Sequence, residues 1–364
     1  MRLVRTIALA AATGLAWPAL GADAPGGGLR GLLDRGKEGI AGGLFGLQVG
    51  AFGDVLWARD PETGRGRLDW GAAELDLGLD LHPDLQSAAA LVWTREQTLL
   101  TVGFLDFHLL GGRIAPRGRI WAEKGFHLQA GRFDVPFGSD WQFFASKDSV
   151  SITRPLTTTA VMDGGYNDAG VRALGNDGTF NFQVYALRGF SKGRLYGGRI
   201  GVMPFGNPFS LKDGPAGKVA EFGLSAFFDR DGSGRGLGRA LAWDAEFRGS
   251  VLQVRGEYLE RRWNSVDGEP GRALRGWHLT VEVPLQDPLG WPVTVFSRVE
   301  RSWAAPPGEA DPGDARVAAG FALPIAGVLQ LKAEVQRWTA VSAATRGEAS
   351  PGGTQGFASL VWVF

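Results

Sequence analysis

The sequence has no cysteine, only seven lysines among its 364 residues, and no excess of charge of either sign. Without cysteine, disulfides cannot stabilise the chain, so the fold must be held by backbone pairing and burial. The 38 basic residues equal the 38 acidic ones, and this balance removes the electrostatic argument for a nucleic-acid partner. We therefore predict no nucleic-acid partner, and we predict no cofactor.

Long apolar runs are scarce, and the first 21 residues are typical of a secretory signal peptide. Two arginines precede an apolar stretch, residues 7–20, which ends in small residues that suit a cleavage site. A membrane anchor is the alternative, but no basic residue follows the stretch directly. Residues 22–364 contain no run of about 18 uncharged apolar residues, the length that a membrane-spanning helix needs. We predict a cleaved signal peptide at 1–21 and no spanning helix after it.

Glycine and aromatic residues, in contrast, are abundant: the chain has 56 Gly, 22 Phe and 13 Trp. This composition suits strands and tight turns better than helices. The stretch AELDLGLDLHPDL illustrates the pattern, because its four alternating leucines lie on one face, opposite Glu74, Asp76 and Asp80. A strand with one apolar and one charged face fits a position between lipid and water.

Segments of this kind recur along the chain and predict an all-β fold, a transmembrane antiparallel β-barrel over residues 44–364. We place strands near 44–58, 68–82, 87–94, 98–109, 126–137, 167–175, 179–188, 194–204, 219–228, 240–248, 250–263, 275–285, 291–303, 315–323, 327–338 and 355–364. Their number, sixteen, is even, as expected when both chain ends lie in the periplasm. Connections 110–125 and 205–218 are too long for simple turns, so fourteen and eighteen strands stay open. Residues 22–43 form a periplasmic lead-in that can include a short helix.

The last strand continues its apolar face to the final residue, with Leu360, Trp362 and Phe364 at alternate positions. A terminal phenylalanine in this pattern resembles the signal that barrel-assembly machinery reads in outer-membrane proteins. We expect the last strand to pair with the first and thereby to remove the open edge of the sheet. A strand of a soluble sandwich that happens to end in phenylalanine is the alternative, although sandwich strands are usually shorter.

Two stretches in the first half of the chain resemble a known family. GRFDVPFG, residues 131–138, and NDAGVRALG, residues 167–175, flank a long connection. They resemble the outer-membrane porin family that includes the phosphate-selective porins O and P. The resemblance covers about fifty residues and implies a sixteen-stranded barrel, often a homotrimer, through which small solutes diffuse. We expect Pro136 to end a strand, because it lacks an N–H, and Phe133 and Phe137 to lie at the membrane rim.

The long connection, residues 139–166, is the predicted third extracellular loop. Loops longer than about 15 residues are usually functional or disordered, and the apolar residues of this one argue against disorder. In general porins the third loop folds into the lumen and narrows it. By position and length, we predict that five charged residues line a pore constriction: Asp140, Lys147, Asp148, Arg154 and Asp163. A loop that caps the barrel rim, with these charges solvated, is the alternative.

The predicted lumen face carries charges of both signs. The lumen-lining candidates are Glu74, Asp76, Asp80, Arg172, Arg199, Arg248, Arg255, Glu257, Glu282, Arg298, Glu300, Lys332 and Glu334. Many of them should pair across neighbouring strands. The phosphate-selective members draw anions through with an arginine ladder and lysine clusters, which this chain lacks. We therefore expect weak or cation-leaning selectivity.

An outer-membrane enzyme, of the lipase or protease type, is the alternative function. The four histidines are scattered, and the sequence has neither a Gly-x-Ser-x-Gly elbow nor a His-x-x-x-His pair, so we predict no catalytic site and no metal site. A triad of His278, Glu282 and Ser297 is imaginable. The segment from Asp229 partly resembles a calcium loop through Asp231, but it lacks the acidic residue at the twelfth position.

These observations predict an outer-membrane porin, a passive diffusion channel for small hydrophilic solutes or ions. Its expected partners are outer-membrane lipid, the barrel-assembly machinery, the permeating solutes and two further copies of the chain. A plugged, structural barrel is a second alternative. The residues do not identify the solute, because a diffusion pore selects by size and field without a dedicated pocket.

Overall fold

We describe the protein from a computed structural model. It describes residues 47–59, 64–111, 124–143, 145–162, 165, 167–189, 193–205, 219–230, 237–249, 251–264, 271–286, 292–305, 313–341 and 353–364. The predicted signal peptide and lead-in lie outside these residues, so both stay predictions. Among the described residues, no helix is both long enough and apolar enough to cross a membrane.

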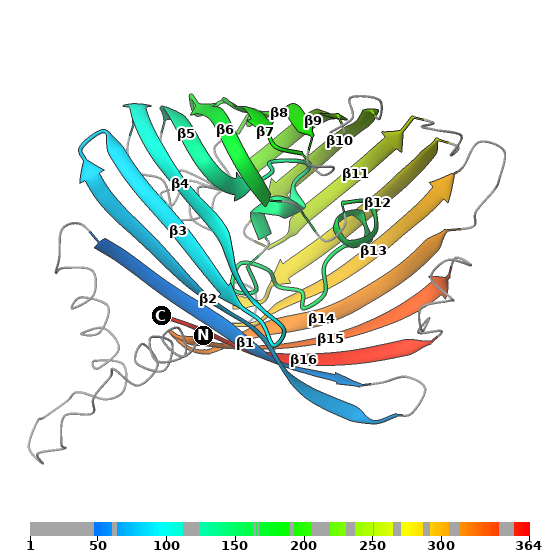
Figure 1. Cartoon of the computed structure of the whole chain (residues 1–364). Helices are drawn as coiled ribbons and strands as arrows, with labels where there is room; N and C mark the ends of the chain where they lie inside the picture. The colour runs from blue at the N-terminus through cyan, green and yellow to red at the C-terminus, as the bar shows by residue number, and fades with distance from the viewer. Residues whose placement is uncertain are drawn as a thin grey trace, which may run out of the picture. The chain divides into compact units, whose positions relative to one another are not determined.

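Sixteen strands form one closed antiparallel barrel (Figure 1). The strands are β1 (Leu47–Arg59), β2 (Gly66–His82), β3 (Leu85–Trp93), β4 (Thr98–Leu110), β5 (Gly125–Asp134), β6 (Asn167–Asn176), β7 (Phe180–Leu187), β8 (Arg194–Val202), β9 (Val219–Arg230), β10 (Leu237–Arg248), β11 (Gln253–Trp263), β12 (Arg272–Pro284), β13 (Thr294–Ala305), β14 (Asp314–Ala326), β15 (Leu329–Ala340) and β16 (Thr354–Val363). Each end lies within three residues of the boundary expected from the sequence. The predicted all-β barrel is therefore confirmed.

The strand number is settled at the two long connections. β4 pairs directly with β5, with Phe104 opposite Gly131, and β8 pairs directly with β9, with Tyr196 opposite Phe228. No strand is inserted between either pair, so the barrel has sixteen strands, and the alternatives of fourteen and eighteen are wrong.

The last strand closes the barrel against the first, as expected. β16 runs antiparallel to β1, and the Phe364 N–H donates to the Ala51 carbonyl at 2.7 Å. Ala51 N–H returns a hydrogen bond to the Phe364 carbonyl at 3.0 Å. Closure pairs the backbone groups that an open sheet edge would leave exposed.

Side chains alternate between an apolar outer face and a buried inner face. On β9, Phe222, Leu224 and Phe228 are 51–57% exposed, whereas Glu221 and Ser225 are each 1% exposed. The same alternation exposes large apolar side chains on most strands of the barrel wall, from Leu68 on β2 to Leu360 on β16. An apolar exterior and a polar interior on one strand are the pattern of a barrel that faces lipid.

The two ends of the barrel differ in the length of their connections. At one end the strands join through tight turns, such as residues 177–179 between β6 and β7. There the Asp177 carboxylate accepts hydrogen bonds from the N–H groups of Phe180 at 2.7 Å and Thr179 at 2.8 Å. These two bonds hold the pKa of Asp177 below its usual value. The other end carries the longest described connection, between β5 and β6.

The GRFDVPFG stretch is placed differently from the sequence expectation in one respect. β5 ends at Asp134, two residues before Pro136, as a residue without an N–H requires. Phe133 and Phe137, however, are 0% and 5% exposed, and the Phe137 ring packs against Phe227 at 4.9 Å. The prediction of a position at the membrane rim is therefore wrong. Both rings belong to an apolar cluster inside the barrel.

Candidate functional site

The inner loop, residues 135–166 between β5 and β6, turns into the barrel interior at Gly138. This residue has a φ of +69°, and a Cβ there would lie 2.2 Å from Glu257 Oε2, so any residue with a side chain would be strained at this position. Its N–H donates to Ser225 Oγ at 3.1 Å, and its carbonyl accepts from Arg199 Nε at 3.2 Å. The first turn of the inner loop is thereby bound to the wall formed by β8, β9 and β11.

Carboxylates on the far wall bind backbone N–H groups of the inner loop. The bonds are Glu257 Oε2 with Ser139 at 2.5 Å and Asp140 at 3.3 Å, Glu300 Oε2 with Leu156 at 2.6 Å, and Glu334 Oε2 with Ile152 at 2.7 Å and Thr153 at 2.9 Å. Each carboxylate is 5% exposed or less. A buried carboxylate is tolerated where donors satisfy it, and these charged bonds are stronger than neutral ones.

Cations on the same wall bind the carbonyls of the inner loop. The bonds are Arg298 Nη1 to the Thr153 carbonyl at 3.0 Å, Arg316 Nη2 to the Arg154 carbonyl at 2.7 Å, and Lys332 Nζ to the carbonyls of Ser146 and Ser149. Arg298 and Arg316 also form ion pairs with Glu300, at 3.0 and 2.7 Å. Carboxylates on β11, β13 and β15 thus bind N–H groups of the inner loop, and cations on β13, β14 and β15 bind its carbonyls.

Apolar contacts also hold the inner loop against the wall formed by β11, β12 and β13. It contains the 3-10 turn η1 (Asp140–Phe143) and the π-helical turn η2 (Thr157–Val161). Trp141 and Val161 are 2% and 1% exposed. η2 packs on β11, β12 and β13, where the absence of a Cβ at Gly276 leaves room for Val161 and Thr157. Figure 1 shows the coiled turns inside the barrel beside β12 and β13.

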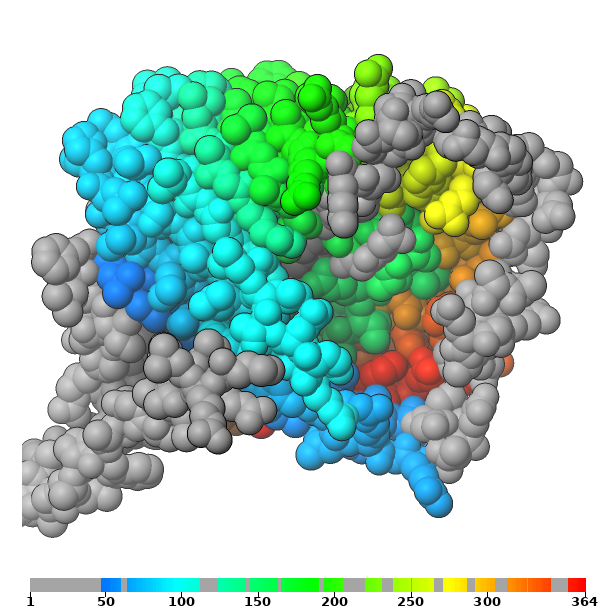
Figure 2. All heavy atoms as spheres, viewed as in Figure 1, coloured from blue at the N-terminus to red at the C-terminus, as the bar shows by residue number. Residues whose placement is uncertain are grey.

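A cavity of about 340 Å³ lies on the opposite side of the inner loop. The strands β1 to β5 form one wall through Phe52, Asp54, Glu74, Thr101 and Asp134, and the inner loop forms the other through Asp140, Ser149, Ile152, Arg154 and Pro155. Green atoms of the inner loop lie in the barrel opening between cyan and orange strands (Figure 2). Four carboxylates and one guanidinium are among the described residues that line this cavity.

The five predicted constriction residues are not all brought together. Asp140 and Arg154 line the cavity, and Asp140 Oδ2 accepts a hydrogen bond from Thr158 Oγ1 at 2.5 Å. Lys147 and Asp148 instead pair with each other at 2.9 Å and are not part of the described lining. Asp163 lies outside the described residues, so its placement stays a prediction. The alternative, a loop that caps the barrel rim, does not hold, because the loop folds inward.

The thirteen predicted lumen-lining residues all lie on inner strand faces, buried or half-buried. Glu74 reaches the cavity. Five of the others, Glu257, Arg298, Glu300, Lys332 and Glu334, bind the inner loop as described above. Others contact side chains of the barrel wall: Arg199 pairs with Glu221 and Asp244, both at 2.7 Å, Arg255 with Glu282 at 3.7 Å, Arg248 with Glu246 at 2.6 Å, and Arg172 with Gln129 at 2.6 Å. Asp76 and Asp80 lie on the inner face of β2.

The imagined catalytic triad does not form. His278 is buried, and its Nδ1 lies 3.0 Å from Thr157 Oγ1 of the inner loop. Ser297 is exposed on the outer face of β13, opposite Val281 in the strand register. Ser297 cannot join His278 because neighbouring residues on a strand face opposite sides, and the inward positions beside it belong to Phe296 and Arg298. Of the calcium-like loop, Asp229 belongs to β9, and Asp231 lies outside the described residues.

Two cavity carboxylates were missed by the sequence analysis. Asp54 interrupts the otherwise apolar segment AFGDVLW of β1, at an irregularity in the pairing with β2. Asp134 lies within GRFDVPFG and is 3% exposed. For Asp54, the signal in the sequence was a lone acidic residue within an apolar segment. For Asp134 the sequence offered no such signal, because its place at the cavity depends on the path of the inner loop.

Comparison with known proteins gives matches of structure. No protein-family model matches the sequence, and no curated protein matches it. The anion-selective porin from Comamonas acidovorans superposes with a TM-score of 0.58 at 13% identity, over 87% of this chain and 99% of the porin. In-vitro folded OmpT, an outer-membrane protein of Vibrio cholerae in its trimer form, gives 0.60 at 8% identity, over 87% and 99%.

The outer-membrane channel DcaP of Acinetobacter baumannii gives a TM-score of 0.55 at 10% identity, over 88% of this chain and 97% of the channel. At these identities the likeness is one of fold. The barrel fold of this chain is thus similar to the folds of these outer-membrane proteins.

Proposed function

We propose that this protein is a passive diffusion channel of an outer membrane, with a preference for small cations. The observation that carries the proposal is the cavity between the inner loop and the β1–β5 wall. Its described lining holds Asp54, Glu74, Asp134 and Asp140 against a single cation, Arg154. Rings of charge at such close range select ions by sign.

The outer surface supports a position in lipid. Leu68, Phe222 and Trp243 are 72%, 57% and 58% exposed on the outside of the wall. Exposing such side chains to water around a whole barrel is unfavourable, whereas lipid accommodates them. We further propose that the predicted signal peptide directs export of the chain and that barrel-assembly machinery inserts it into the outer membrane.

The lining argues against the anion preference of some members of the resembled family. An anion channel needs cations that remain available to the solute. Here Arg298, Arg316 and Lys332 bind carbonyls of the inner loop, and Arg199 is held between Glu221 and Asp244. The resemblance to the phosphate-selective group therefore supports the barrel and the inner loop in our proposal. We do not propose phosphate selectivity.

We extend the proposal to assembly as a homotrimer. The support is the trimer form of the Vibrio cholerae neighbour together with the family resemblance of residues 131–138 and 167–175. Mass photometry of the purified chain in detergent tests this point, since a trimer and a monomer differ threefold in protein mass.

Planar-bilayer recording of the refolded mature chain tests the function. Stepwise open-channel conductance is expected, with a reversal potential on the cation side in a KCl gradient. Arg154→Gln should increase the cation preference, and Asp54→Asn should decrease it. A unit charge about 8 Å from a passing ion contributes about 0.5 kcal/mol in water, which corresponds to a change of about twofold in relative permeability.

Arg67→Gln is the matched control, because Arg67 is 69% exposed, pairs with Asp69 and is not part of the described cavity lining. It should leave the reversal potential unchanged. A folded barrel without conductance would refute the channel and favour the plugged-barrel alternative. If Arg154→Gln and Asp54→Asn both have the wild-type reversal potential, the ion path lies away from this cavity.

A further inference from the structure

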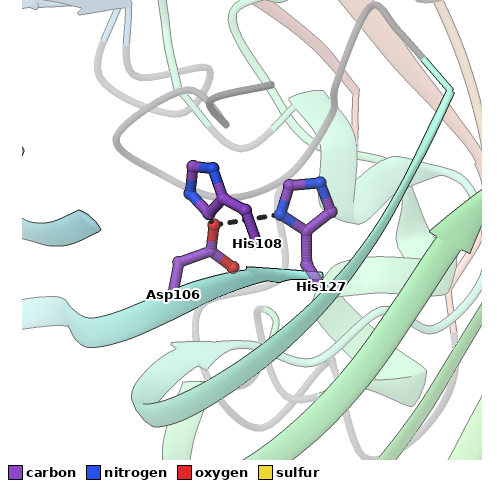
Figure 3. Close-up of side chains that lie close together, drawn as sticks. All are labelled: Asp106, His108 and His127. Atoms are coloured by element: carbon purple, nitrogen blue, oxygen red, sulfur yellow. Dashed lines mark hydrogen bonds and ion pairs between the residues drawn. The ribbon is translucent and has the colours of Figure 1, made fainter. Parts of the chain in front are cut away.

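One carboxylate and two imidazoles meet on the inner face of the barrel where β4 pairs with β5. Asp106 and His108 are two residues apart on β4 and therefore face the same side, and His127 on β5 lies opposite His108 in the strand register. Asp106 Oδ2 lies 2.7 Å from His108 Nε2 and 3.0 Å from His127 Nδ1. Figure 3 shows both rings converging on the carboxylate.

The cluster is buried, and its hydrogen bonding is incomplete. The side chains of Asp106, His127 and His108 are 0%, 1% and 5% exposed. Within the described part of the chain, Asp106 Oδ1 and His108 Nε2 make no hydrogen bond. His108 Nε2 and Asp106 Oδ2 are thus only 2.7 Å apart, but their geometry is not that of a hydrogen bond. Buried polar atoms without partners are costly, and each needs an explanation.

A metal ion supplies that explanation. Each of the three residues offers one ligand atom, and the three atoms all lie within 4.8 Å of one another. An ion with bonds of about 2.0–2.2 Å to nitrogen and oxygen in tetrahedral geometry separates its ligand atoms by roughly 3.3–3.5 Å. Small side-chain rotations therefore reach a ligating arrangement, and the paired backbones of β4 and β5 keep the ligands together.

We propose that Asp106, His108 and His127 bind one divalent transition-metal ion, with Zn²⁺ as the best match. Two imidazoles and one carboxylate suit Zn²⁺, Cu²⁺ or Ni²⁺ and do not suit Mg²⁺ or Ca²⁺, which prefer oxygen ligands alone. Three protein ligands leave a fourth coordination position for water or a solute. The sequence analysis missed the site because its ligands follow strand spacing and cross-strand register and form no recognised sequence motif.

Among the described residues, no further side chain joins this set of three ligands. Gln129 lies opposite Asp106 in the register, but its Oε1 already accepts from Arg172 Nε at 2.6 Å. Arg172 is held further by Gln183 at 3.3 Å and by stacking over Phe133 at 4.4 Å. The site is also separate from the cavity of the proposed channel, since none of its three ligands belongs to that described lining. The inference therefore stands whether or not the channel conducts.

Metal titration of the refolded, chelator-treated full chain tests the inference. Zn²⁺ is titrated in competition with a chromophoric chelator, and one high-affinity Zn²⁺ per barrel is expected. His108→Gln and His127→Gln should each weaken binding at least 10-fold, because even losing a group that merely orients a ligand costs about 10- to 100-fold. Asp106→Asn should act in the same direction.

His82→Gln is the matched control. His82 lies 3.7 Å from Asp84 and is 65% exposed, so it represents a surface histidine beside a carboxylate. Its replacement should leave affinity and stoichiometry unchanged. Loss of binding in His82→Gln, or wild-type binding in folded His127→Gln, would overturn the assignment.

A measurement on the unaltered chain guards against variants that fail to fold. Co²⁺ added to the wild-type barrel should give the intense visible absorption of a tetrahedral site, and one equivalent of Zn²⁺ should remove it. Zn²⁺ should also raise the thermal unfolding midpoint, since an ion that binds the folded state alone stabilises it. Absence of both the Co²⁺ spectrum and stoichiometric Zn²⁺ binding would refute the site.

Discussion

At the scale of single residues, inward-facing charges perform two different tasks. Glu257, Glu300 and Glu334 accept hydrogen bonds from backbone N–H groups of the inner loop. Asp54 and Glu74 face the cavity instead. The first group sets where the loop lies, and the second sets the field that a solute meets. Charge sign alone, read from the sequence, does not separate these tasks.

Gly138→Ala should destabilise the barrel by about 1–3 kcal/mol, the cost of holding a residue with a side chain at a left-handed φ. The added Cβ would also collide with the Glu257 carboxylate, which holds the first turn of the inner loop. Urea unfolding of the refolded protein in lipid vesicles measures the change.

The control for this substitution is Gly327→Ala in the turn between β14 and β15. No atom lies within 4 Å of the position that its Cβ would occupy. Its effect should stay within about 0.5 kcal/mol. Equal losses in the two variants would mean that Gly138 has no special role.

At the scale of elements, the inner loop is the part whose position the rest of the molecule must hold. Glu334→Gln removes the charge that binds the N–H groups of Ile152 and Thr153. Hydrogen bonds to a charged group contribute about 1.5–3 kcal/mol against about 1 for neutral ones. The loop should therefore become more mobile, seen as faster cleavage by a protease and as larger current fluctuations in the open channel.

Glu282→Gln serves as the comparison, because Glu282 faces inward but forms an ion pair with Arg255 on the barrel wall. Cleavage of the loop should stay at the wild-type rate in this variant. If Glu334→Gln also behaves like wild type, the apolar contacts of Trp141 and Val161 hold the inner loop without help from the carboxylates.

The elements were predictable because their signal is local. Alternation over about ten residues located all sixteen strands, and the proline of GRFDVPFG marked the end of β5. The same stretch led to a wrong prediction for Phe133 and Phe137, because aromatic residues near the ends of barrel strands commonly lie at the membrane rim. Both rings are buried instead, because Phe133 points inward from β5 and Phe137, in the inner loop, packs against Phe227 inside the barrel.

At the scale of the whole barrel, stability depends on the apolar outer face. Leu224→Arg, in the middle of β9, should cost about 2–4 kcal/mol in a bilayer, because it places a charge on the lipid face near the midplane. Leu224 is 51% exposed on the outer face, so the substitution leaves the side chains of the barrel interior in place. The unfolding free energy in lipid vesicles measures this cost.

Leu68→Arg is the position control for the outer face. Leu68 is 72% exposed near the start of β2, where a charge should cost about 0–1 kcal/mol. A similar cost at both positions would argue against a depth-dependent lipid environment. The proposed membrane location would then lose its main energetic support.

The sequence by itself determined where the strands lie, which of their faces point inward and outward, and that β16 pairs with β1, because the alternation with a period of two is carried by neighbouring residues. The strand number was decided by the structure, in which β4 pairs directly with β5 and β8 with β9. The tertiary structure alone decided which charges hold the inner loop, which face the cavity, and that Asp106, His108 and His127 meet. These contacts join distant positions; Ile152 and Glu334 are 182 residues apart. Strand register and the path of the inner loop bring such residues together, and no local pattern encodes either.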